Sequence, residues 1–134
     1  MALKYSRQRE SIKKYLSNTK EHPTADMVYT YIRKQYPNIS LGTVYRNLNL
    51  LVNQGNIIKF TTGDGSDRFD GRTSKHYHFM CTKCSEVSDL FMSLDFINMV
   101  NKSANSEFKG DICGHNTLFY GLCNECHELQ DENI

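Results

Sequence analysis

Four cysteines arranged as two CxxC pairs could do the most definite chemistry in this 134-residue chain. Cys81 and Cys84 form the first pair, and Cys123 and Cys126 form the second, with residues 85–122 between them. A tetrahedral zinc ion takes four thiolates, and each short turn presents two of them on one side of the chain. The spacing predicts a structural Zn2+ site that stabilises a small domain, so the function must reside elsewhere.

Two other interpretations of these cysteines are weaker. Two disulfides would need an oxidising compartment, whereas the N-terminus has no apolar signal core and we expect a cytoplasmic protein. The run from Cys123 to His127 also matches the c-type haem attachment pattern, but this would leave the first cysteine pair without a role. No apolar run is long enough for a membrane span.

A second group of candidate ligands begins with His76 and His78. Alternate residues of a strand share a face, so both imidazoles can bind one ion while Tyr77 points the other way. Asp89 lies on the expected partner strand, residues 86–91. By spacing alone only the two histidines are predicted to bind metal, because a lone His22 or Asp70 is typically a surface histidine and a turn aspartate.

Charge divides the chain into two parts with different partners. Residues 1–62 hold ten Lys or Arg against three acidic residues, and residues 63–134 hold six against twelve. A basic part of this kind favours a polyanion such as DNA.

Three helices, each with a capping residue, are predicted in the basic part. Ser6, Thr24 and Ser40 can cap them, and Pro37 and Gly55 end the second and third. Strands at 57–62 and 67–70 then form a hairpin across a glycine-rich turn. Three helices followed by a hairpin predict a winged helix-turn-helix.

The third helix is the expected reader of double-stranded DNA. Its exposed side is predicted to carry Thr43, Tyr45, Arg46 and Asn47, which can contact base edges or phosphates. Lys13 and Lys14 are expected to contact phosphates.

The acidic part is predicted to form a sheet covered by a helix. Strands are expected at 76–80, 86–91, 107–112 and 117–121, and a helix at 93–104 should turn Leu94, Ile97, Val100 and Ala104 inward. The fold class is therefore α+β. A winged helix-turn-helix domain (1–70) precedes a small zinc-stabilised α/β dimerisation domain (71–134).

Five motifs in order resemble the ferric uptake regulator (Fur) family over nearly the whole chain. They are His22-Pro-Thr-Ala-Asp26, Ser40-Leu-Gly-Thr-Val-Tyr-Arg-Asn-Leu48, Asp67-Arg-Phe-Asp70, His76-Tyr-His-Phe-Met-Cys-Thr-Lys-Cys84 and Tyr120-Gly-Leu-Cys-Asn-Glu-Cys126.

The resemblance implies a homodimeric, metal-dependent repressor that binds a palindromic DNA operator. It implies a regulatory Fe2+ or Mn2+ held by His22, Asp70, His76, His78 and Asp89. Asp89 places the chain nearest the peroxide-sensing branch, since iron-sensing members typically carry Glu there. In that branch hydrogen peroxide oxidises ligand histidines, which correspond here to His22 and His76.

Three alternatives remain at this point. The first is an iron- or manganese-responsive repressor without peroxide chemistry. A metal-dependent hydrolase or deaminase is disfavoured, because no HxE or HExxH motif supplies a general base. A zinc-stabilised protein-interaction module would leave the basic part unexplained. Cys113 is expected to be a small buried residue and His115 to be structural.

Overall fold

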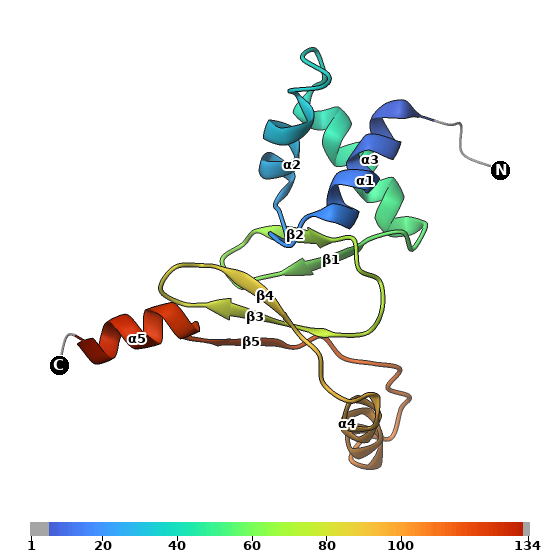
Figure 1. The fold of residues 1–134 in the computed structure, drawn as a ribbon. Coiled ribbons are helices and arrows are strands. Elements are labelled where there is room, and N and C mark those ends of the chain that lie inside the picture. The colour runs from blue at the N-terminus through green and yellow to red at the C-terminus, as the bar shows by residue number, and fades with distance from the viewer. Residues whose placement is uncertain (1–5, 133–134) are drawn as a thin grey trace. The chain divides into compact units, whose positions relative to one another are not determined.

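The computed structural model describes residues 6–132 and divides the chain into two compact units, residues 1–74 and 75–134. The first unit contains α1 (Arg7–Asn18), α2 (Ala25–Ile32), α3 (Leu41–Asn53), β1 (Ile58–Thr61) and β2 (Asp67–Asp70). The second contains β3 (Tyr77–Cys81), β4 (Val87–Leu90), α4 (Leu94–Ser106), β5 (Leu118–Gly121) and α5 (Asn124–Glu132). Both kinds of element occur, so the predicted α+β class is confirmed (Figure 1).

Side-chain caps define where the helices of the first unit begin. Ser6 Oγ accepts the N–H of Arg9 at 3.2 Å, and Ser40 Oγ accepts the N–H of Thr43 at 3.1 Å. Thr24 caps α2 in the same way. Each cap satisfies one of the backbone donors that a helix leaves free at its N-terminus.

One apolar core holds the three helices and the hairpin together. Its members come from the three helices, from β2 and from the segments just before α3 and β1: Ile12, Leu16, Ala25, Val28, Ile32, Ile39, Val44, Leu48, Leu51, Ile57 and Phe69. Met27 and Tyr31 share the helical spacing of α2 but are exposed.

The antiparallel strands β1 and β2, with the turn at residues 62–66, form what we call the wing hairpin (residues 58–70). Gly63 and Gly65 adopt positive φ in the turn, where a side chain would be strained. Just after β2, a Cβ on Gly71 would lie 2.6 Å from the Leu16 carbonyl oxygen, so only glycine permits this approach to α1.

The second unit is built on a three-stranded sheet in the order β4-β3-β5. β3 pairs antiparallel with β4 and parallel with β5. Ser93 caps α4, as its position before the helical pattern suggests. Within residues 6–132, no helix is both long and apolar enough to cross a membrane.

Two expectations for this unit are wrong, and one helix was not predicted. No strand forms at 107–112, because the Asn105 side chain bonds both the N–H and the carbonyl of Ile112, at 2.8 and 2.9 Å, in place of a strand partner. Of the predicted inward residues of α4, Ile97 is buried but Leu94 and Val100 are exposed. Helix α5 was not expected, because its sequence has no apolar stripe.

Candidate functional site: two metal sites and a DNA-reading helix

The four sulfurs of the two CxxC pairs converge in the second unit. All lie within 4.8 Å of one another, and the Sγ atoms of Cys84 and Cys123 are 3.8 Å apart. Zn–S bonds of about 2.3 Å meeting at the tetrahedral angle separate neighbouring sulfurs by about 3.8 Å. The observed separation therefore fits a ZnS4 centre.

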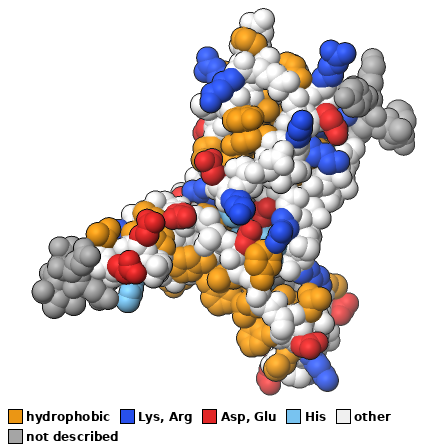
Figure 2. Space-filling model, viewed as in Figure 1, with side chains coloured by type: hydrophobic (Ala, Val, Ile, Leu, Met, Phe, Trp, Pro, Cys, Tyr) orange, Lys and Arg blue, Asp and Glu red, His pale blue; other side chains and the backbone are white. Residues whose placement is uncertain are grey.

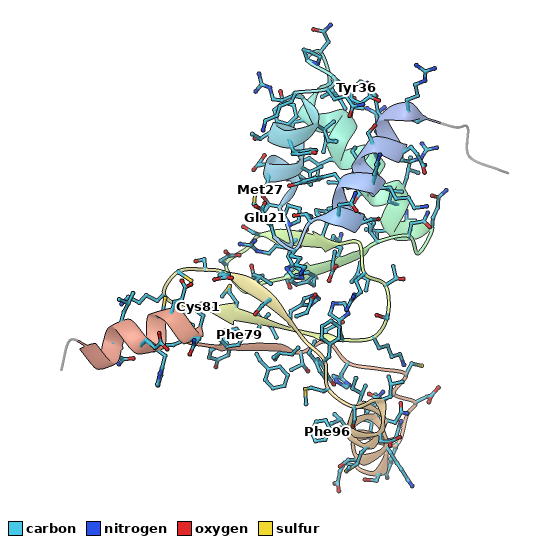
Figure 3. The ribbon with its side chains drawn as sticks, viewed as in Figure 1. Glu21, Met27, Tyr36, Phe79, Cys81 and Phe96 are labelled. Carbon is cyan, nitrogen blue, oxygen red and sulfur yellow. The ribbon has the colours of Figure 1, made fainter. Side chains whose placement is uncertain are left out.

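The sheet and α5 present these cysteines. Cys81 ends β3, beside the segment that leads into α5 (Figure 3). A tight turn follows, in which the N–H of Ser85 bonds the Cys81 carbonyl at 2.9 Å. The N–H of Thr82 bonds the Gly121 carbonyl at 2.8 Å, which joins the first cysteine turn to the end of β5.

The protonation of these thiols shows what the cluster requires. The backbone N–H groups of Cys84 and Cys123 lower the pKa of Cys81 to about 6. Hydrogen bonding to Cys123, together with burial, raises the pKa of Cys126 to about 12. One sulfur thus ionises readily, while another keeps its proton unless a cation offsets the crowded negative charge. A divalent metal that prefers sulfur provides this charge.

His78 and Asp89 are direct partners in the antiparallel register of β3 and β4. Residues paired in this way project to the same face, and His76, two positions before His78, shares it. The Nε2 atoms of His76 and His78 lie 3.0 and 3.5 Å from Oδ1 of Asp89. The three side chains form a compact group, which we call the triad.

In the first unit, His22 and Asp70 form a second group, which we call the pair. His22 Nε2 lies 3.5 Å from Asp70 Oδ2, and both residues are buried. His22 precedes α2 and Asp70 ends β2, so the wing hairpin brings together residues far apart in the sequence. Imidazole nitrogens and carboxylate oxygens of this kind suit Fe2+ or Mn2+ better than thiolates do.

The candidate reading residues of α3 are not all available to a groove. Tyr45 and Arg46 are exposed and Thr43 is half-buried, whereas Asn47 is only 7% exposed. Asn47 follows Val44 by one helical turn and precedes Leu48 and Leu51, so it lies on the core stripe. The expectation that Asn47 faces outward is wrong. Of the two lysines expected at phosphates, Lys14 is exposed and Lys13 half-buried.

A hydrogen-bond network that the sequence does not predict surrounds His115. Its Nδ1 lies 2.7 Å from Asn101 Oδ1 of α4, and its Nε2 bonds the hydroxyl of Tyr77 on β3. Both ring nitrogens are engaged within the unit, which supports the structural role expected for His115. The network links α4 to the sheet, and no spacing rule joins these three positions. Cys113, expected to be buried, is exposed.

Comparison with known proteins decides the family. The model of the family described as "Ferric uptake regulator family" matches residues 1–120. The chain belongs to the ferric uptake regulator family. Fur proteins are metal-responsive, DNA-binding transcription regulators.

Curated and solved relatives agree with this assignment. The chain is 38% identical over 122 residues to the peroxide-responsive repressor PerR of Staphylococcus epidermidis, covering 90% of this chain and 79% of the relative. It superimposes on the Campylobacter jejuni peroxide stress regulator with a TM-score of 0.74 and 31% identity, covering 89% of this chain and 88% of that one. For the Helicobacter pylori ferric uptake regulator Fur the TM-score is 0.78 and the identity 25%, with coverages of 93% and 83%.

The identity of the metal at each site follows from the donor atoms and from the family to which the chain belongs. The chain has a structural Zn2+ site at its four cysteines and a regulatory site for Fe2+ or Mn2+ among its histidines and aspartates.

Proposed function

We propose that this Fur protein is a repressor that senses hydrogen peroxide through oxidation of its own metal-binding histidines. The observation that carries the proposal is the triad, in which Asp89 lies within 3.5 Å of both His76 and His78. Relatives named for the peroxide response, at 38% and 31% identity, support it.

The regulatory ion, in this proposal, takes ligands from both the pair and the triad. His22 and Asp70 supply one nitrogen and one oxygen, and the triad supplies two nitrogens and one oxygen. An octahedral ion accepts six ligands, so five protein ligands leave one position for a small molecule.

Histidines at such a site are well placed to be oxidised. Fe2+, when bound, would activate the O–O bond of hydrogen peroxide, and the imidazole would supply the two electrons that reduce the peroxide overall. In the net reaction a C–H bond of an imidazole becomes C–OH, one oxygen atom of the peroxide is retained and the other leaves as water. We assign the oxidised residues as His22 and His76. Each event consumes a ligand, so the protein reports peroxide once and does not turn over.

DNA recognition is assigned to the first unit. The protein is proposed to act in the cytoplasm. Arg46 and Tyr45, exposed on α3, can reach base edges, Thr43 is half-buried beside them, and Lys13 and Lys14 can neutralise phosphates. Lys and Arg side chains gather over this three-helix unit (Figure 2). The proposed operator is palindromic, because a symmetric dimer presents two identical reading helices to it.

The second unit is proposed to form a homodimer. Its surface exposes large apolar side chains on the β4–α4 connection, α4 and β5, namely Phe91, Leu94, Phe96, Met99, Phe119 and Tyr120. β5 is also an edge strand of the sheet. Apolar patches and open strand edges favour association, here with a second copy of the chain.

A DNA-binding assay at controlled concentrations of metal and peroxide tests the proposed function. A duplex is first selected from a random library by the Mn2+-loaded protein, and is then bound by the Fe2+-loaded and the Mn2+-loaded protein. We expect low peroxide to release the duplex from the Fe2+ form only. Release from neither form would favour the alternative, an iron- or manganese-responsive repressor, for which the TM-score of 0.78 to Helicobacter pylori Fur is the supporting observation.

A further inference from the structure

The wing hairpin is hydrogen-bonded to the loop that carries His22. The N–H of Phe69 donates to the Pro23 carbonyl at 2.9 Å, and Thr24 forms an isolated antiparallel bridge with Arg68. Arg68 adds a side-chain contact, since its Nη1 donates to the carbonyl oxygen of His22 at 3.1 Å. Three successive residues of the loop are therefore held by two residues of β2.

His22 needs this support because its backbone is strained. Its φ is 52°, in the left-handed region that residues with a Cβ adopt at a cost. In this conformation the imidazole faces Asp70 at 3.5 Å, and its edge meets the ring of Phe60 at a centroid separation of 5.9 Å. Arg68 therefore donates its hydrogen bond to the carbonyl oxygen of His22, the residue whose own backbone is strained.

An arginine at position 68 is not the side chain that would give the folded protein the greatest stability. Its Nε is buried and makes no hydrogen bond within residues 6–132. A buried donor without a partner is destabilising, and an apolar side chain of similar length would remove that penalty. The guanidinium is also a positive charge close to a ligand of a cation, which disfavours metal binding. Both considerations point to a geometric role that outweighs these disadvantages.

We propose that Arg68 is a positioning residue for His22. By bonding the carbonyl of His22, the guanidinium fixes the left-handed backbone and so directs the imidazole toward Asp70. The inference rests on the proposed function, in which His22 is a ligand of the regulatory metal. It adds a residue that binds no metal and acts only through a ligand.

Mn2+ affinity of the zinc-loaded full chain tests the assignment, measured from the electron paramagnetic resonance signal of free Mn2+. Arg68→Met should weaken Mn2+ binding by roughly tenfold or more, the usual effect of losing a residue that orients a ligand. Loss of a positive charge would by itself strengthen binding, so weakening identifies geometry as the cause. Arg68→Lys, which keeps a donor, should recover part of the affinity. Lys59→Met, on the exposed side of the same hairpin, should change nothing.

A double-mutant comparison separates positioning from a general structural role. In a His22→Ala background, Arg68→Met should cause no further loss of Mn2+ affinity, because it acts through the missing ligand. The melting temperature without Mn2+ should be no lower for Arg68→Met than for the wild type, because the substitution also removes the buried unpaired donor. Unchanged Mn2+ affinity in Arg68→Met, an equal further loss in the His22→Ala background, or a parallel fall in melting temperature would each overturn the assignment. If the wild type itself binds no Mn2+, the proposed function fails, and the role of Arg68 fails with it.

Discussion

The four cysteine sulfurs lie so close together that several of them cannot be negatively charged at once unless a cation is bound between them. Cys84 and Cys123 are 3.8 Å apart, and the pKa of Cys126 rises to about 12 because a neighbouring sulfur and burial both oppose its ionisation. Zinc binding removes this repulsion, and in small domains the free energy of zinc binding becomes free energy of folding.

Replacing one thiolate should therefore unfold the second unit. Cys126→Ser is expected to lose zinc and to lower the melting temperature sharply, since structural zinc contributes about 10–16 kcal/mol of apparent binding free energy. Zinc content by elemental analysis and thermal melting measure this. Cys113→Ser is the matched control and should change neither. A Cys126→Ser variant with full zinc and an unchanged melting temperature would rule out the four-cysteine site.

Zinc binding should release protons and weaken as the pH falls. With a pKa of about 6, Cys81 is mostly thiolate at pH 7, whereas Cys126 at about 12 is a thiol. The pKa of Cys84 is also raised: the N–H of Glu86 opposes the shift, but bonding to Cys81, burial and bonding to Cys123 outweigh it. Zinc must displace these protons, so acid competes with the metal and lowers its affinity.

Calorimetry of Zn2+ binding to the reduced, zinc-free chain in two buffers of different ionisation enthalpy measures the proton release. At pH 7 we expect about two protons or more for each zinc, from Cys84 and Cys126. Heats that do not depend on the buffer would mean that all four sulfurs are already ionised.

Among the elements, those with local signals could be predicted from the sequence. The caps Ser6, Thr24, Ser40 and Ser93 mark helix starts because a hydroxyl before an apolar-periodic run satisfies free N–H groups. The alternation of His76 and His78 predicted that both side chains share a face, and in the structure His76 directly precedes β3 while Asp89 lies opposite His78.

Other features depend on contacts that no local pattern reports. Helix α5 has no apolar stripe, and its buried Cys126 belongs to the sulfur cluster. Asn105 replaces an expected strand pairing by bonding Ile112 through its side chain. Asn47 is polar yet lies on the core stripe of α3, where composition alone suggests an exposed position.

Helix α3 should read DNA through Arg46. Arg46→Ala is expected to cost roughly 1–3 kcal/mol at one base pair of the selected duplex and to relax specificity there, because a bidentate contact to a base is lost. Lys14→Ala should instead weaken all sequences evenly and reduce the salt dependence of binding. Binding to a panel of single-base variants distinguishes the two. An even loss across the panel for Arg46→Ala would limit that residue to phosphate contacts.

At the scale of the whole molecule, two units of opposite charge are proposed to carry separate tasks and to be linked by the regulatory metal. Asp89→Ala should keep zinc, the dimer and the melting temperature, because Asp89 lies outside the sulfur cluster. The same variant should lose Mn2+-stimulated DNA binding. Zinc analysis, sedimentation and DNA titration at fixed Mn2+ test this. Full affinity for the duplex in Asp89→Ala would show that the triad has no regulatory role.

Peptide mass spectrometry after peroxide treatment tests the central claim most directly. Trypsin cleavage gives a peptide of residues 21–33, which contains His22, and a peptide of residues 76–83, which contains His76. Met27 and Met80 lie in the same two peptides and can also take up oxygen, so fragment ions must locate the added atom. We predict one added oxygen on His22 or His76 in the Fe2+-loaded protein at low peroxide, and none on either histidine in the Mn2+-loaded protein. Unmodified histidines in the Fe2+ form, with DNA binding retained, would contradict peroxide sensing by this protein.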